Sequence, residues 1–288
     1  MEIFYAWLAS IASGLEPLGL KASTKSLIRN PWLFNILWLA GLLPFTIPFA
    51  LYTGGGMPHD WVPLVGIAVC SAVFYALYTI TLYKVDLSTI APLFSLRTIF
   101  ALLIGVYILH ETISPLGWLL ITVILIASPF AAYDEVFKFR AFRNRYLVLA
   151  VVVMTALAGI GYFVHLSYAV NGFATTLLWQ DALALLLLLP ALLYKSVRRE
   201  KITPKKLLPF VLLGVIGLVY NTSTILAYGH NLAISSVIIS LPLSMYFVWF
   251  ASRRYSRLLE PHPPRVNRIR FTAATVMVAC AIWLSLLY

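Results

Sequence analysis

The sequence predicts an all-α polytopic membrane protein, with ten transmembrane helices arranged as a 5+5 inverted-repeat bundle. Of the 288 residues, 61% are hydrophobic and only 11% are charged, whereas soluble domains carry roughly 25% charged residues. Apolar runs of about 18 to 24 residues recur along the chain, and each is long enough to cross a hydrocarbon core of roughly 30 Å. A third observation, an internal repeat, predicts the inverted arrangement.

The predicted spans follow one another from end to end of the chain. In order they are residues 3–20, 31–52, 61–83, 87–109, 115–133, 147–170, 174–194, 208–229, 233–251 and 271–288. The connections between them are short, as in LYKVDL and AVNGFA, or basic. They leave no room for a soluble domain, so functional side chains are expected between the helices. The start, MEIFYAWLASIASG, carries Glu2 and no Lys or Arg, which argues against a cleavable signal peptide.

The basic residues fall almost entirely in the odd-numbered connections. The even-numbered connections, which contain TGGGMPHD, HETIS, NGF and GHNL, have no Lys or Arg. By the positive-inside rule the odd connections face the cytoplasm, and both termini are expected outside an inner or plasma membrane. The net charge of +11 therefore reflects topology and attraction to anionic membrane lipids, and we expect no nucleic-acid partner.

Two stretches of the chain resemble each other at an offset of 145 residues. YALYTITLYKVDLSTIAPLFSL begins at Tyr75 and YNTSTILAYGHNLAISSVIISL begins at Tyr220, and the shared positions continue across a turn without a gap. This register predicts a duplication. Each copy contains an odd number of spans, so the second enters the membrane from the opposite side, as in many secondary transporters. The predicted organisation is a first repeat at 1–137, a basic linker at 138–146 and a second repeat at 147–288.

The repeated positions place polar side chains along one face of two helices. Tyr75 and Thr79 lie one turn apart in the third span, and Tyr220 and Thr224 do the same in the eighth, with Asn221 beside them. Because polar groups facing lipid are costly, these faces should turn inward. They are predicted to bind substrate, although hydrogen bonding between helices would explain each residue equally well. Tyr83 and Tyr228, at helix ends, could also be interface aromatics.

Three charged side chains lie within the predicted spans, namely Glu16, Arg97 and Asp181. Charges there cost roughly 2.5 to 3.5 kcal/mol or more unless paired or hydrated, so each is a functional candidate. Arg97 lies deepest and could pair with a carboxylate, with Asp181 favoured by depth, or with an anionic substrate group. Burial favours the protonated form of a carboxyl group, so Glu16 and Asp181 are candidate proton carriers.

Further candidates surround these charges. Trp179 and Gln180 precede Asp181 and are predicted to help bind substrate. His165, in the sixth span, could relay protons or bond a neighbouring helix. Cys70 and Cys280 lie in mid-helix and are read as core residues, because their spacing fits neither a disulfide framework nor a metal site.

The chain resembles the EamA-type branch of the drug/metabolite transporter superfamily, which is built from two five-helix repeats. The resemblance is carried by YTITLYKVDLSTIAPLFSL through GVYILHETISPLGWLLI and by TSTILAYGHNLAISSVIISLPLSMYF. Pro242 fits the family's proline step and Glu111 its glutamate, whereas Arg97 stands in the matching proline position and Ser256 in the matching glutamate position. The resemblance implies a transporter of small organic metabolites. Many members keep both termini in the cytoplasm, and the charges here predict the opposite.

Other classes of protein fit less well. HExxH, GxSxG and clustered Asp ligands are missing from the sequence, so we expect no enzyme, no bound metal and no cofactor. With no Walker motif, a proton gradient or exchange should supply the energy for moving a metabolite such as an amino acid. An intramembrane enzyme or a non-transporting structural protein remains the alternative, and monomer and homodimer are equally open.

Overall fold

The helices of the protein account for nearly all of its described chain. The computed structural model describes residues 2–23, 28, 30–84, 94–131, 145–194, 197, 202–252 and 263–288, and it contains no strand within these ranges. The helices are α1 Glu2–Ser23, α2 Pro31–Tyr52, α3 Val62–Lys84, α5 Phe94–Leu103, η2 Ile104–Ile108, α6 Pro115–Ala131, α7 Arg145–Leu188, η4 Leu189–Leu193, α9 Pro204–His230, α10 Leu232–Ile239, α11 Leu243–Ser252 and α12 Pro264–Leu287.

Several of these helices are long and apolar enough to cross a membrane. Among the described residues there are six such segments, namely Pro31–Tyr52, Val62–Thr79, Val151–Leu193, Lys206–His230, Leu232–Phe250 and Pro264–Leu287. Two shorter apolar helices cover Leu96–Ile108 and Pro115–Ala131. The structure thus confirms a multi-pass, all-helical membrane protein. The basic linker at 138–146 and Ser256 lie largely or wholly outside the described residues.

Two of the long segments are interrupted by local backbone chemistry. Gly172 adopts φ 76° and ψ 174° inside α7, a conformation that residues with a Cβ rarely adopt, so α7 is two helices joined at a sharp turn. The 43 residues of Val151–Leu193 would extend roughly 65 Å as one straight helix, about twice the hydrocarbon thickness. Pro242 lies between α10 and α11 and has no N–H with which to continue the helix.

Helix starts are set by capping side chains that the sequence supplies. The Asn30 side chain accepts hydrogen bonds from the backbone N–H groups of Trp32 at 2.9 Å and Leu33 at 3.3 Å, and Pro31 follows as the first helical residue. This combination begins α2 at the predicted residue.

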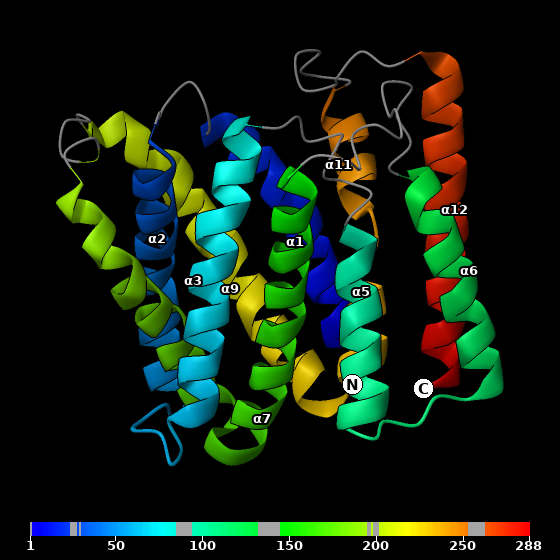
Figure 1. Ribbon diagram of the computed structural model, residues 1–288, viewed down its shortest axis with the longest axis horizontal. Helices are drawn as coiled ribbons and strands as arrows, with labels where there is room; N and C mark the ends of the chain where they lie inside the picture. Colours follow the sequence, from blue (N-terminus) through cyan, green and yellow to red (C-terminus); the bar gives the residue numbers. More distant parts are fainter. Residues whose placement is uncertain are drawn as a thin grey trace.

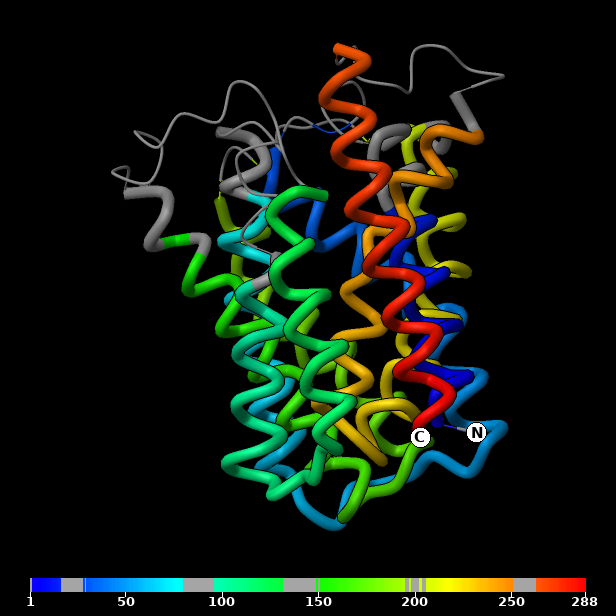
Figure 2. Tube along the Cα trace, turned by 90° about the vertical axis from the view of Figure 1, so that its right-hand side faces the viewer, coloured from blue at the N-terminus to red at the C-terminus, as the bar shows by residue number. Residues whose placement is uncertain are grey.

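The two halves of the sequence pack against each other most extensively through α3 on α7, followed by α1 on α9, and α2 also packs on α9. Gly41 of α2 and Gly214 of α9 allow a close approach, because a Cβ added to Gly41 would lie 2.7 Å from the Phe210 carbonyl oxygen. Both chain termini lie at the lower end of the bundle in Figure 1, and Figure 2 shows the same end from the side. The Tyr288 hydroxyl accepts a hydrogen bond from the Ser114 N–H at 2.7 Å, which places the η2–α6 connection at this terminus-side end.

Candidate functional site

Ionisable side chains from five helices lie within electrostatic range of one another, as a chain of pairs, inside the bundle. Glu16 of α1 lies within electrostatic range of Arg97 of α5. Tyr75 of α3 lies within the same range of Asp181 of α7, of Glu16 and of Tyr220 of α9. The structure therefore brings together five residues that the sequence singled out separately. They come from both halves of the chain, so a ligand held among them would contact both halves.

Arg97 is held by phenol hydroxyls rather than by a carboxylate. Its Nη2 donates a hydrogen bond to the Tyr228 Oη at 2.7 Å and lies 3.4 Å from the Tyr220 Oη. The two tyrosines are two helical turns apart on one face of α9. Tyr228 is 2% exposed, and Arg97 is mostly buried with a smaller part of its surface exposed. Within the described residues no carboxylate lies within 4 Å of Arg97, so the hydroxyls bind the guanidinium group without neutralising its charge.

Asp181 has a different partner from the one its depth suggested. Its Oδ2 accepts a hydrogen bond from the Asn221 amide at 2.6 Å, and the Gln180 side chain also bonds it. Depth along a helix fixes the level of a side chain but not its direction. Tyr220 and Asn221 are neighbours on α9 and point about 100° apart, so one reaches Arg97 and the other Asp181.

Two predicted binding residues are occupied in contacts between structural elements. The Thr79 hydroxyl donates to the Asn35 Oδ1, and the Asn35 amide donates to the Tyr75 carbonyl oxygen at 2.8 Å, so Thr79 ties α3 to α2. The Trp179 indole donates to the Gly56 carbonyl oxygen at 2.9 Å and packs edge-on against Trp61. Thr79 therefore makes a hydrogen bond between helices, which is the alternative interpretation for this residue, and Trp179 contacts the connection between α2 and α3.

Thr224 completes the polar face of α9 between Tyr220 and Tyr228. Its hydroxyl is buried and forms no hydrogen bond within the described part of the chain. A buried hydroxyl without a partner typically costs about 1 to 3 kcal/mol. Such a group is a candidate ligand contact at the position where the sequence predicts one.

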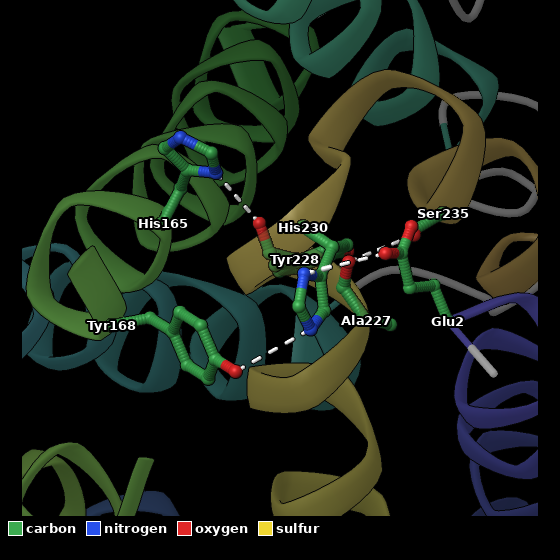
Figure 3. Close-up of polar contacts among 7 residues, drawn as sticks. All are labelled: Glu2, His165, Tyr168, Ala227, Tyr228, His230 and Ser235. Atoms are coloured by element: carbon green, nitrogen blue, oxygen red, sulfur yellow. Dashed lines mark hydrogen bonds and ion pairs between the residues drawn. The ribbon is translucent and has the colours of Figure 1, made fainter. Parts of the chain in front are cut away.

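Tyr228 is the site residue that the sequence analysis left undecided. Its spacing of four residues from Thr224 and eight from Tyr220 is the available sequence signal, but its position near a helix end also fits an interface aromatic. The backbone adds a second contact, because His165 Nδ1 lies 2.8 Å from the Tyr228 carbonyl oxygen (Figure 3). His165 thus bonds a neighbouring helix, which is one of its two predicted roles.

The end of α9 also contacts the start of the chain. His230 Nδ1 lies 3.4 Å from Glu2 Oε1, and the Tyr168 hydroxyl lies 3.4 Å from His230 Nε2 (Figure 3). Both members of the Glu2–His230 pair are about half exposed, at 53% and 43%. Exposed pairs of this kind typically contribute less than about 1 kcal/mol. The Glu2–His230 contact nevertheless places the start of α1 beside the α9–α10 turn.

Comparisons with known proteins agree with this architecture. Residues 1–132 match the EamA-like transporter family. A comparison with curated proteins found no match. Among solved structures, one described as "Crystal structure of protein" aligns with a TM-score of 0.78, covering 99% of this chain and 96% of that chain at 16% sequence identity. At this identity the match shows the fold, and it extends over both halves of the chain.

Proposed function

We propose that this chain, a membrane protein of the drug/metabolite transporter kind by its match to the EamA-like family over residues 1–132, is a secondary active transporter. It exports or exchanges a small organic metabolite by alternating access. The observation that carries the proposal is the Arg97 cluster, where a charged side chain is held by neutral hydroxyl groups between the two halves of the chain. A charge at this depth is a functional candidate, and inverted-repeat transporters bind substrate between their repeats.

The inverted-repeat arrangement of ten helices is part of the proposal. Tyr75 and Tyr220 are related by the sequence offset of 145 and lie within electrostatic range of each other. Equivalent residues of two repeats approach one another where they lie near the axis that relates the repeats. The turn at Gly172 divides α7 into two helices that correspond to the predicted spans 147–170 and 174–194, whereas Pro242 interrupts the helix within the predicted ninth span, 233–251.

The chemistry around Arg97 suits an anionic group on the substrate. Tyr220 and Tyr228 use their oxygen atoms to accept from Arg97, so each phenol O–H remains free to donate. Neither hydroxyl has an acceptor among the described residues. Two phenol donors beside a guanidinium group match a carboxylate, which accepts several hydrogen bonds and balances the charge. Thr224 and Asn221 lie on the same part of α9 and are proposed as further contacts.

The proposed energy source is a proton gradient or exchange of metabolites. Glu16 and Asp181 are the carboxyl groups of the cluster, and either could carry the proton. Asp181 is held by Asn221, whereas Glu16 forms no hydrogen bond to another described residue. An amino acid fits the cluster as a substrate, because its carboxylate would meet Arg97 while its ammonium group would meet a carboxyl group.

Purified protein in liposomes tests the transport proposal. A thermal-shift screen against metabolite pools would first select solutes that stabilise the protein, since a ligand stabilises the state it binds. Labelled forms of these solutes should then enter loaded liposomes faster with the protein than without it. If selected solutes are chemically converted, the protein is an enzyme. If none moves and none is converted, a non-transporting structural role replaces the proposal.

The proposed membrane orientation predicts which connections a water-soluble reagent can reach. In a variant without Cys70 and Cys280, a cysteine replacing Met57 should react with a membrane-impermeant maleimide in intact cells, because the side chain of Met57 is 77% exposed in an even-numbered connection. A cysteine replacing Ile202, exposed in a basic odd-numbered connection, is the matched control and should react only after lysis. The reverse pattern would invert the topology.

A further inference from the structure

Glu111 joins the two halves of the chain at the start of α10. It lies in the connection between η2 and α6, and its Oε1 accepts a hydrogen bond from the backbone N–H of Leu232 at 2.6 Å. Its Oε2 accepts from the backbone N–H of Ala233 at 2.8 Å. A carboxylate at the first amides of a helix forms charge-assisted hydrogen bonds and is favoured by the helix dipole. This is therefore a strong polar contact between the halves.

The local backbone is shaped to bring this carboxylate to α10. The π-helical turn η2 ends α5, and the Glu111 N–H donates to the Gly105 carbonyl oxygen at 2.9 Å. His110, immediately before, has φ 56°, which is uncommon for a residue with a Cβ. A Cβ at Gly105 would lie 2.6 Å from Glu111 Oε2 and 2.8 Å from the Ala233 Cβ. Only glycine at position 105 permits this approach.

Helix α10 is already capped from within its own half. The Asn231 side chain accepts from the Ile234 N–H at 2.8 Å and is the N-cap of the helix. The two Glu111 bonds therefore add a connection between halves to a helix that is already begun. Asn231 therefore caps α10 without contacting the other half, whereas Glu111 contacts α10 from the other half. A change at Asn231 can serve as the matched control for a change at Glu111.

The contact between Glu111 and α10 lies close in the chain to Tyr228, which binds Arg97. Leu232 follows Tyr228, the principal hydrogen-bond acceptor of Arg97, by four residues, and every residue of α10 is buried. A movement of Glu111 away from α10 would therefore act on the segment that positions Tyr228. The Tyr288–Ser114 and Glu2–His230 contacts place the Glu111–α10 contact at the terminus-side end of the bundle.

The second half of the sequence does not repeat this feature. At the offset of 145, Ser256 matches Glu111 and Phe250 matches Gly105. Ser256 lies outside the described residues, but a serine side chain has no carboxylate. Phenylalanine in place of the glycine is bulky and here is 70% exposed. At the two positions that match Gly105 and Glu111, the second repeat therefore has neither a glycine nor a carboxylate.

We propose that Glu111 is a positioning residue of the transport cycle, which holds the two halves together at the terminus-side end while the central site opens toward the opposite end. Its two hydrogen bonds to α10 break when the site opens at the terminus side. This inference rests on the proposed transport function, because it assigns a contact to one of the two alternating states. It predicts that weakening the contact shifts the population toward the terminus-side-open state.

A cysteine at Thr224 reports that state, because the side chain is buried on the Arg97 face of α9. In a variant without Cys70 and Cys280, the Thr224→Cys side chain is modified with an impermeant maleimide applied from the face that labels a cysteine replacing Met57. Glu111→Gln keeps the shape of the side chain but removes its charge, and should raise the modification rate about tenfold, in line with the loss of a charge-assisted hydrogen bond. Asn231→Ala removes a cap of the same helix but leaves the Glu111 side chain in place, and should change the modification rate by less than about twofold.

The labelling rates of the two variants decide between the inference and a purely structural role for Glu111. An unchanged rate in a folded Glu111→Gln protein, or an equal increase in Asn231→Ala, would show that Glu111 only stabilises α10 and would overturn the inference. Thermal unfolding and size-exclusion profiles verify that both variants fold. The assay needs no substrate, so a protein that moves no solute but shows the selective rate increase would refute transport and retain a Glu111-controlled opening.

Discussion

Replacing Arg97 with alanine is expected to leave a folded protein that has lost most of its affinity for substrate. The hydrogen-bond acceptors of Arg97 among the described residues are the neutral hydroxyls of Tyr220 and Tyr228, so its removal leaves no ion-paired charge behind. Hydrogen bonds to charged groups contribute about 1.5 to 3 kcal/mol, which corresponds to roughly a 10- to 150-fold loss of affinity. Thermal shift and labelled-solute binding measure the fold and the affinity separately.

Arg97→Lys separates charge from shape at the same position. Lysine keeps the positive charge but replaces the planar guanidinium fork with a point charge, so binding should be weak rather than lost. A folded Arg97→Ala protein with unchanged affinity would remove Arg97 from the site. If Arg97→Ala instead fails to fold and a second change of Glu16→Gln restores folding, the partner of Arg97 is the protein's own carboxyl group. Asp181 is the less suitable rescue position, because Asn221 already bonds it.

Local sequence signals predicted the positions of individual helices well. The range 31–52 agrees with α2 because Asn30 and Pro31 mark its start and a glycine-rich turn follows its end. The break in α7 falls at Gly172, within the NGF connection between two predicted spans. Apolar length, capping residues and turn residues act within a few positions of one another, so a single sequence contains the information needed.

Contacts between helices were harder to predict. The repeat predicts Tyr75 and Tyr220 on inward faces, and in the structure the two lie within electrostatic range of each other. It did not show that Arg97 would bond Tyr228 while Asp181 bonds Asn221, because these choices depend on how each helix is rotated about its axis. The sequence likewise did not predict that Glu111 binds the backbone of α10. A carboxylate in a connection gives no sequence signal for the distant amides that it binds.

Neutralising the proton carrier is expected to abolish accumulation of substrate against its gradient while exchange of substrate across the membrane continues. The reason is that uphill movement requires a group that binds and releases a proton in each cycle, whereas exchange requires only that the loaded protein change its facing direction. Glu16→Gln and Asp181→Asn are close in shape to the side chains they replace. Proteoliposomes with an imposed pH gradient measure accumulation, and liposomes preloaded with unlabelled substrate measure exchange.

The surroundings of the two carboxyl groups favour Glu16 as the carrier. It lies within electrostatic range of Arg97 and has no hydrogen bond to another described residue, so it can respond when an anion reaches the guanidinium group. Asp181 is bound by Asn221 and Gln180, and its replacement should mainly lower stability by about 1 to 3 kcal/mol through the lost partner. We therefore expect Glu16→Gln to lose accumulation and keep exchange, with Asp181→Asn retaining both. Loss of accumulation in Asp181→Asn alone would assign the proton to Asp181, and normal accumulation in both variants would exclude the two as coupling groups.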